Sequence, residues 1–348
     1  MPGWDINDKD SNTVGDVNTI EEVVEKLRKS RDIALSKNNS LIDEENSNNE
    51  DEKEKALLDI KQYSFFSDAD KPFIEEEELN DILDSLEIKK NIVLQGPPGV
   101  GKTFVAKKIA YEMMKKTDDT KIEIVQFHQS YSYEDFIQGI RPSEKTFKVK
   151  NGIFYNFCKR AEQNPENKYF FIIDEINRGN LSKIFGELMM LIETDKRGKS
   201  KVHLTYSEKD DAPFSVPENL YIIGTMNTAD RSLAIVDYAL RRRFRFVSLK
   251  PKFNDKFVDL LSTQVFSKYF IHNIIAKIDS LNQKIQSDKN LGEGFQIGHS
   301  FFCTNKMNKS ENEWFKDIIK YEIAPLLEEY WFDDIEKSQA EIKLLLSE

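Results

Sequence analysis

The chain has 348 residues, of which 39% are hydrophobic and 32% are charged, and its 61 acidic residues exceed its 50 basic residues to give a net charge of −11. At roughly 150 residues per domain this length predicts about two domains, and the acidic balance excludes a protein whose whole surface is basic for nucleic acid. Two cysteines exclude a disulfide framework and indicate a reducing cytosol, while the lack of a ~20-residue apolar run or a secretion signal predicts a cytoplasmic protein with no membrane partner.

An acidic leader covers residues 1–60. It holds 16 acidic and 8 basic residues, a net charge of −8. The polar stretch 36–55 cannot bury enough apolar surface to offset its ordering entropy, so we expect a linker that is partly disordered. Apolar residues at helical spacing predict a short helix over 20–35, either a solvated tail or a partner-binding helix. A further helix is predicted over 67–86, with Pro72 near its start.

A phosphate-binding loop follows the first predicted strand. The apolar, β-branched run 91–95 is typical of a buried parallel strand, and helical periodicity extends from Phe104 to Met114. Between them lies G-x-x-x-x-G-K-T, in the strand–loop–helix context that this motif requires. Lys102 is expected to reach the β and γ phosphates, and the Thr103 hydroxyl to bind Mg²⁺. The predicted nucleotide-binding residues are Gly96, Pro97, Pro98, Gly99, Val100, Gly101, Lys102, Thr103, Phe104 and, from a later strand, Asp174.

Two later strands each end in polar side chains. The run 169–173 leads into Asp174 and Glu175, and the run 220–224 leads into a turn that contains Asn227. Since the carboxyl ends of parallel strands meet at one sheet edge, these side chains are expected beside the phosphate loop. Asp174 would then hold Mg²⁺, Glu175 would be the general base, and Asn227 would position the water or the γ-phosphate. A helix cap for the acids and ordinary turn chemistry for the asparagine are the alternatives.

Four arginines crowd the segment Asp237–Arg245. Arg242 or Arg243 is expected to act as an arginine finger on the γ-phosphate of a neighbouring subunit, because guanidinium is permanently charged, planar and rich in donors. A surface ion-pair network and direct contact with DNA are the alternatives.

In this order, these elements resemble the AAA+ superfamily. Residues 96–103 match its Walker A motif, 172–175 its Walker B motif, Asn227 its sensor 1, and Arg242 or Arg243 its finger. Over about residues 70–340 the chain is similar to one branch, the McrB-type GTPase subunit of modification-dependent (5-methylcytosine) restriction systems. The strings that carry this likeness are 125–139, 174–178, 226–231, 294–300 and 324–330.

The resemblance implies a three-layer α/β/α domain with a parallel sheet over 61–250 and a small α-helical lid over 251–348. It further implies a ring, commonly a hexamer, that binds GTP in preference to ATP. A partner nuclease subunit of the McrC type would stimulate hydrolysis and cut the DNA that the ring translocates, so no nuclease activity is expected in this chain.

Two features keep alternatives open. The N-K-x-D motif that reads guanine in Ras-like proteins is absent, so GTP and ATP stay open as substrates, and an ATP-dependent protein-remodelling AAA+ protein of the dynein-related or MoxR-like sort is the alternative function. The N-terminal domain that reads DNA in this family is replaced by the leader, which predicts either a missing N-terminal domain or recognition by another subunit.

A few single residues have two interpretations each. His299 lies where an AAA+ lid offers its sensor 2 residue, and is either a nucleotide contact or a structural histidine. Arg178 and Arg231 either bridge to a neighbouring subunit or pair with local acids. The four histidines form no ligand pair, so no metal besides Mg²⁺ is expected. The aromatic cluster of Phe127, Tyr131, Tyr133 and Phe136 is expected in the core and at an interface, with a base-stacking platform as the alternative. Cys158 is expected in the core.

Overall fold

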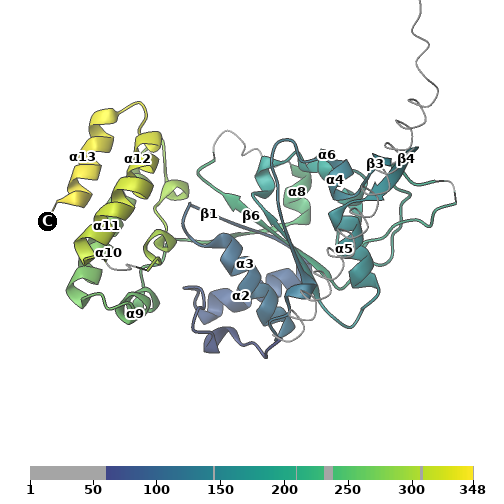
Figure 1. The fold of residues 1–348 in the computed structure, drawn as a ribbon, viewed down its shortest axis with the longest axis horizontal. Coiled ribbons are helices and arrows are strands. Elements are labelled where there is room, and N and C mark those ends of the chain that lie inside the picture. Colours follow the sequence, from purple (N-terminus) through teal and green to yellow (C-terminus); the bar gives the residue numbers. More distant parts are fainter. Residues whose placement is uncertain (1–59, 144–145, 209, 231–237, 306–308, 348) are drawn as a thin grey trace, which may run out of the picture. The chain divides into compact units, whose positions relative to one another are not determined.

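The computed structural model describes residues 60–143, 146–208, 210–230, 238–305 and 309–347. The predicted leader, apart from its last residue, and the helix predicted over 20–35 lie outside the described residues. In the part that is described, five parallel strands form one sheet in the order β2-β5-β6-β1-β7 (Figure 1). Their bounds are β1 Asn91–Gly96, β2 Ile122–Gln126, β5 Tyr169–Asp174, β6 Leu220–Asn227 and β7 Arg245–Ser248.

Helices cover both faces of the sheet. Neighbouring residues of β5 belong to different hydrophobic clusters, Phe171 and Ile173 to one and Phe170 and Ile172 to the other. Because successive side chains of a strand point to opposite faces, the sheet is buried on both sides. One face packs against α2 (Glu76–Lys89) and α3 (Lys102–Met114), and the other against α4 (Tyr133–Phe136), α5 (Ile153–Glu162), α6 (Leu181–Phe185) and α7 (Leu188–Leu191). This arrangement confirms the predicted three-layer α/β/α fold.

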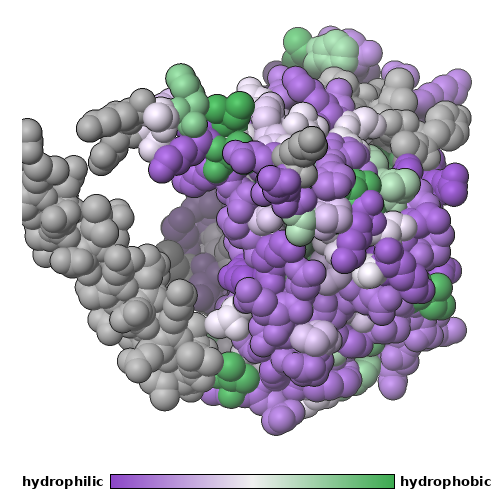
Figure 2. Space-filling model, turned by 90° about the vertical axis from the view of Figure 1, so that its right-hand side faces the viewer, coloured by the Kyte–Doolittle hydropathy of each residue, from purple (hydrophilic) through white to green (hydrophobic). Residues whose placement is uncertain are grey.

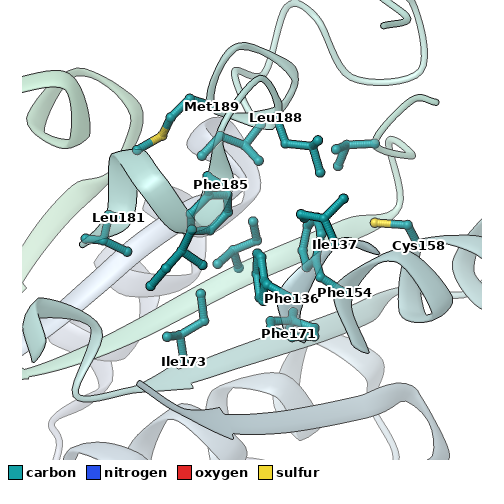
Figure 3. Packing of buried hydrophobic residues seen from close by; sticks show 14 of the residues in the cluster. Phe136, Ile137, Phe154, Cys158, Phe171, Ile173, Leu181, Phe185, Leu188 and Met189 are labelled. Atoms are coloured by element: carbon teal, nitrogen blue, oxygen red, sulfur yellow. The ribbon is translucent and has the colours of Figure 1, made fainter. Parts of the chain in front are cut away.

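Aromatic rings fill the second of these layers (Figure 3). The ring of Phe136 lies 4.8 Å from that of Phe154, 4.9 Å from that of Phe185 and 5.6 Å from that of Phe171. Such contacts add to the hydrophobic effect of burying the rings. Cys158 is 1% exposed in the same cluster, which confirms its predicted place in the core.

Several predicted boundaries differ from the structure. The helix predicted over 67–86 begins only at Glu76, because the Asp68 carboxylate accepts hydrogen bonds from the Asp70 amide and the Tyr63 hydroxyl and closes a turn ahead of Pro72. The sequence analysis also missed β2, β7 and the antiparallel hairpin of β3 (Gln138–Ser143) and β4 (Thr146–Asn151). The hairpin has few apolar residues and contains a proline, so its strand pattern is weak.

A helical lid follows β7. It consists of α9 (Asp255–Thr263), α10 (Lys268–Ser287), α11 (Glu311–Ile318), a π-helical turn over Ile319–Ile323, α12 (Ala324–Tyr330) and α13 (Ile335–Leu346). These helices share a hydrophobic cluster of their own, which includes Trp314 and Ile278. Helical structure was predicted from 257 to 346, and the lid confirms it. None of the helices among the described residues is long and apolar enough to span a membrane.

Candidate nucleotide-binding site

The carboxyl ends of β1, β5 and β6 lie side by side at one edge of the sheet. Gly96, the last residue of β1, is paired in register with Asn227, the last residue of β6. Strand β5 pairs with the other side of β6 and ends at Asp174. The three segments that the sequence analysis assigned to one site are therefore neighbours in space, and Figure 1 shows α3 leaving this edge after β1.

The phosphate-loop backbone has the conformation that its glycines allow. Gly99 has φ +76° and Gly101 has φ +71°, both in the left-handed region that other residues rarely adopt. Gly101 caps the amino end of α3, so helix α3 begins with Lys102. The free N–H groups of this helical turn can bind an anion, since a helix amino terminus lacks internal partners for them.

Lys102 is buried behind the loop. Its Nζ donates to the carbonyl oxygens of Gly96 at 3.1 Å and Pro97 at 2.9 Å, and to Oδ1 of Asn227 at 2.6 Å. Burial lowers the pKa of Lys102 to about 8, although the carboxylates of Glu175 and Asp174 act in the opposite direction. A phosphate that binds here would therefore meet a poorly solvated ammonium group, and its oxygens could replace the carbonyl oxygens as hydrogen-bond acceptors.

Two oxygens suited to a magnesium ion lie together. The Thr103 hydroxyl donates to Oδ1 of Asp174 at 2.7 Å, and the hydroxyl of Thr225 also donates to this carboxylate oxygen. Hydroxyl and carboxylate oxygens are ligands that Mg²⁺ prefers. The residues present thus fit the ion that the sequence analysis predicted, with Thr103 and Asp174 as the holding groups.

The Glu175 carboxylate lies between Asn227 and Arg178 at the end of β5. The Glu175 backbone has φ +51°, an uncommon value for a residue other than glycine. Oε1 accepts a hydrogen bond from Nδ2 of Asn227 at 2.6 Å, and Oε2 lies 3.3 Å from Nε of Arg178. Burial raises the pKa of Glu175, although Arg178 opposes that effect.

The predicted finger arginines lie at the opposite edge of the sheet. Helix α8 (Tyr238–Arg243) ends where the Arg243 carbonyl accepts from Nδ2 of Asn91, the first residue of β1. Since a strand rises about 3.3 Å per residue, this carbonyl is about 16 Å from the phosphate-loop end of β1. Arg243 pairs with Glu193 at 2.9 Å and is 17% exposed, whereas Arg242 is 3.8 Å from Glu193 and 79% exposed. The structure therefore does not bring either arginine to the site of its own chain.

Asn91 and Arg197 support this arginine segment, and the sequence analysis missed both. Arg197 is 1% exposed and donates to Oδ1 of Asn91 and to the Ile192 carbonyl. No motif marks either residue. A buried arginine with backbone acceptors leaves no signal in a single sequence.

Other predicted residues have structural partners of their own. Arg178 pairs within the chain with Glu175 and with Asp230, at 2.9 Å from the latter. Arg231 lies outside the described residues. Phe104 is 46% exposed on α3, beside the Lys108 ammonium, which lies 5.1 Å from its ring.

A loop of the lid rests on the phosphate loop. The amide of Gly298 donates to the Pro98 carbonyl at 3.1 Å, and the amide of Ser300 to the Gly99 carbonyl at 2.8 Å. A Cβ on Gly99 would lie 2.4 Å from the Phe301 ring, so only glycine permits this approach. His299 is buried, and its Nδ1 accepts from the Lys252 amide at 3.1 Å. Its contacts are those of a structural histidine.

A small cavity of about 20 Å³ adjoins the phosphate loop on this side. Val100 of the loop forms part of its wall, and the residues that line it include Phe73, Ile74, Glu78, Lys252 and His299. Glu78 and Lys252 form an ion pair and are 29% and 23% exposed. The sequence analysis did not identify this cavity, since Glu78 and Lys252 lie 174 positions apart in the chain.

The chain is similar to known protein families and proteins. Residues 91–244 match the family described as AAA domain (dynein-related subfamily), residues 273–339 match the McrB alpha-helical lid domain, and residues 7–151 match the IstB-like ATP binding proteins. The chain is 54% identical over 281 residues to the type IV methyl-directed restriction enzyme EcoKMcrB subunit of Escherichia coli (strain K12). The matched region covers 79% of this chain and 61% of that protein. The chain is also 27% identical over 254 residues to the type II restriction enzyme BsuMI component YdiS of Bacillus subtilis (strain 168). The matched region covers 60% of this chain and 73% of that protein. The chain thus spans less than two thirds of the first relative.

Proposed function

Because the chain is an AAA+ protein of the McrB type over its AAA+ and lid regions, we propose that it is a Mg²⁺-dependent nucleoside triphosphatase, with GTP as the favoured substrate. The observation that supports this most directly is the hydrogen-bonded set of Lys102, Asn227 and Glu175 beside Thr103 and Asp174. These side chains supply a cation, an amide and a carboxylate, which are the kinds of group that phosphate binding, water positioning and proton transfer require.

Each residue of the set has a step to perform. The loop amides and Lys102 bind the β and γ phosphates. The Thr103 hydroxyl and the Asp174 carboxylate would hold Mg²⁺, which would offset the charge of those phosphates when bound. Glu175 orients the attacking water and takes its proton, while Asn227 positions that water against the γ-phosphate.

We propose that an arginine of a neighbouring subunit completes the site. Arg242 is the better candidate, because its side chain is mostly exposed while Arg243 is tied to Glu193. An arginine supplied in trans often accelerates phosphoryl transfer by ~10³-fold or more. Hydrolysis would thus depend on assembly into a ring, with a hexamer as the form expected for this family.

The biological role we propose follows the restriction-enzyme relatives. The ring would translocate DNA and work with a McrC-type nuclease subunit that cuts the DNA and stimulates hydrolysis.

The domain boundaries we propose are 61–250 for the nucleotide domain and 251–348 for the lid.

Contact with DNA is proposed for the β3–β4 hairpin. Arg141, which forms an ion pair with Asp135, lies directly opposite Lys148 on the neighbouring strand. Lys150 lies on the same face two residues along, and all three basic residues are exposed. The opposite face carries exposed Ile140, Phe147 and Val149. Hydrophobic side chains also interrupt the mainly hydrophilic surface that Figure 2 shows from the hairpin side of the molecule. A basic face on an otherwise acidic chain suits the phosphates of a nucleic acid.

The deciding experiment measures GTP and ATP hydrolysis at matched concentration with Mg²⁺, with and without a McrC-type nuclease subunit. GTP turnover that the nuclease subunit stimulates would support the restriction role. Comparable turnover of ATP would instead favour the second candidate, an ATP-dependent protein-remodelling AAA+ protein, toward which the match to the dynein-related AAA domain points.

A further inference from the structure

Two buried polar side chains hold the segment that carries Arg242 and Arg243. We propose that these two, Asn91 and Arg197, are positioning residues for the arginine that reaches the neighbouring subunit's nucleotide, so that they act on hydrolysis in trans. The inference rests on the proposed function, because it requires an arginine that completes the next site. Asn91 begins β1 and Leu220, to which Arg197 donates, begins β6, so the pair lies at the sheet edge opposite the phosphate loop.

The amide of Asn91 joins two segments that are far apart in the chain. Its Nδ2 donates to the Ile192 carbonyl at 2.8 Å and to the Arg243 carbonyl at 3.1 Å. Arg243 is the last residue of α8, so the second bond fixes the end of that short helix. Because Asn91 is 0% exposed, water cannot readily take its place as the donor, and loss of the bond would leave the carbonyl without one.

The guanidinium of Arg197 orients Asn91. It donates to Oδ1 of Asn91, to the Ile192 carbonyl at 3.1 Å and to the Leu220 carbonyl. A guanidinium only donates, whereas a side-chain amide has one accepting end and one donating end. With Oδ1 held by Arg197, the amide must direct its donor end toward Ile192 and Arg243. Arg197 therefore determines which way Asn91 points.

Arg197 also supports the acid that holds the arginine side chains. Its backbone amide donates to the Glu193 carbonyl at 3.2 Å, and its side chain donates to the carbonyl just before that one. The Glu193 carboxylate is 15% exposed, pairs with Arg243 at 2.9 Å and lies 3.8 Å from Arg242. One buried residue thus supports the backbone of the arginine segment through Asn91, and its side chains through Glu193.

The charge of Arg197 makes it an expensive structural support. The residue is 1% exposed, and the three acceptors of its side chain are neutral oxygens. Burial lowers its pKa to about 10, which reflects the penalty of keeping the ion out of water. Apolar residues fill buried sites at a lower cost. A guanidinium instead supplies several donors in one rigid plane, which suits a group that fixes geometry.

A purely structural role is the alternative, because β1 leads from Asn91 to the phosphate loop at Gly96. A disturbance at Asn91 would in that case impair the nucleotide site of its own subunit. In the role proposed here it would impair the site of the neighbour. The two roles therefore differ in which subunit loses activity, and rings of mixed subunits separate them.

The test is the substitution Asn91→Asp in the full chain. Aspartate has the shape of asparagine and keeps an acceptor for Arg197, but it has no donor for the Ile192 and Arg243 carbonyls. A displacement of about 1 Å can lower a rate by ~10²-fold, so GTP hydrolysis with Mg²⁺ should fall about 10- to 100-fold. The affinity for GTP should stay within about twofold, because the phosphate loop is unchanged. Phosphate release and equilibrium binding measure the two quantities.

Mixing with Glu175→Gln provides a readout that a structural role would not move. Glu175→Gln subunits lack the base but keep the arginine segment, so they should restore part of the activity of Asn91→Asp subunits, above the sum of the two proteins alone. Lys102→Ala subunits are impaired in their own site and should gain nothing from the same partner. In an Arg242→Ala background, Asn91→Asp should lower hydrolysis by less than about twofold further, because an absent side chain cannot be misplaced.

Asn219→Asp is the matched control. Nδ2 of Asn219, the residue before β6, donates to the carbonyls of Ala161, Asn164 and Asn167 at 3.0, 3.0 and 2.7 Å. The substitution removes the same kind of donor at the same edge of the sheet, but none of these acceptors belongs to the arginine segment. Folded Asn219→Asp should hydrolyse GTP like the unchanged chain and gain nothing on mixing with Glu175→Gln.

The outcomes separate this role from the proposed function. Full activity of Asn91→Asp, or a loss that Glu175→Gln subunits do not restore, would mean that the pair does not act in trans. If Arg242→Ala and Arg243→Ala both hydrolyse GTP normally, the arginine in trans is itself wrong. If the unchanged chain hydrolyses no nucleotide, the proposed function fails.

A second variant is available should Asn91→Asp not fold. Arg197→Lys keeps the buried charge, but a single ammonium cannot reach all three acceptors in the geometry of the guanidinium. Its hydrolysis should fall at least about threefold, and Glu175→Gln subunits should restore part of it. Unchanged hydrolysis in Arg197→Lys, or no restoration, would overturn the role of the pair.

Discussion

The side-chain amide of Asn227 donates from Nδ2 to Oε1 of Glu175 at 2.6 Å. The other end of the same amide accepts from the Lys102 ammonium at 2.6 Å. One short side chain at the end of β6 therefore fixes both the group proposed to bind phosphate and the group proposed to activate water. A nucleotide that draws Lys102 toward its phosphates would at the same time loosen the hold on Glu175.

Replacement of Glu175 with glutamine should separate binding from hydrolysis. The amide keeps the shape of the carboxylate but cannot take a proton from water, so hydrolysis should fall by about 10²- to 10⁴-fold while nucleotide affinity changes little. Steady-state phosphate release and equilibrium binding of the same nucleotide measure the two effects. Glu166→Gln, on the exposed turn before β5, is the matched control and should retain full activity. Equal losses of affinity and turnover in Glu175→Gln would speak against the base role.

The pKa of Lys102 predicts how nucleotide binding depends on pH. Burial lowers this pKa to about 8, so the ammonium is present below pH 8 and is lost as the pH rises above it. Because phosphate binds the charged form, affinity should be level below pH 8 and fall toward tenfold per unit above it. Binding titrations between pH 7 and 9 measure this effect. Lys102→Arg stays charged over the whole range and should lack the break at pH 8, even if it binds more weakly. A break of the same size in both proteins would assign the titration to another group.

The sheet and the phosphate site could be predicted because local patterns encode them. The buried strands β1, β5 and β6 are apolar runs in the sequence. Each leads into the side chains proposed to act on the nucleotide, which are Lys102 and Thr103, Asp174 and Glu175, and Asn227. Predicted strands and the rule that parallel strands share one edge were enough to group them. The hairpin was not predicted because its two exposed strands have few apolar residues and one of them contains a proline. The contact between Glu78 and Lys252 could not be predicted, because it depends on the path of the chain after β7. The periodicity of apolar residues within a short segment does not indicate that path.

Arg242 and Arg243 should respond differently to alanine. Arg242→Ala removes an exposed side chain, so the fold should be unaffected, and hydrolysis should fall ~10³-fold if this is the finger. Mixing Arg242→Ala with Glu175→Gln should restore part of the activity, because some interfaces then combine an intact glutamate with an intact arginine. Failure of every mixing ratio to restore activity would contradict action in trans. Arg243→Ala leaves Glu193 without its 2.9 Å partner and should cost about 1–3 kcal/mol of stability, which denaturant unfolding measures.

The basic face of the hairpin should make DNA binding depend on salt. Lys148→Gln together with Lys150→Gln removes two exposed charges, so affinity should fall for all DNA sequences alike. The slope of log affinity against log salt should become shallower by about 2. Nucleotide hydrolysis without DNA should be unchanged, and Lys199→Gln, exposed elsewhere, should leave the salt slope as it is. An unchanged slope in the double variant would remove the hairpin from the DNA-binding surface.

His299 should make stability decrease in mild acid. Burial, and secondarily the charge of Lys252, lower its pKa from 6.5 to about 4. In the unfolded chain the imidazole binds a proton near pH 6.5, but in the folded chain it does so only near pH 4. The stability contribution is therefore complete above pH 6.5 and is lost as the pH falls toward 4. Between pH 7 and 5 the free energy of unfolding should decrease by about 2 kcal/mol from this group.

Removal of the titrating ring separates this effect from that of the carboxylates. His299→Asn keeps an acceptor for the Lys252 amide, which now donates to Nδ1 at 3.1 Å, but it cannot titrate in this range. Its stability should be lower at pH 7, because the contacts of the ring with Phe73 and Phe253 are lost. Its additional loss between pH 7 and 5 should be smaller than that of the unchanged chain by about 2 kcal/mol. Denaturant unfolding at the two pH values measures both quantities. Parallel losses in the two proteins would mean that His299 is accessible to protons in the folded state, and that the lid loop opens without nucleotide.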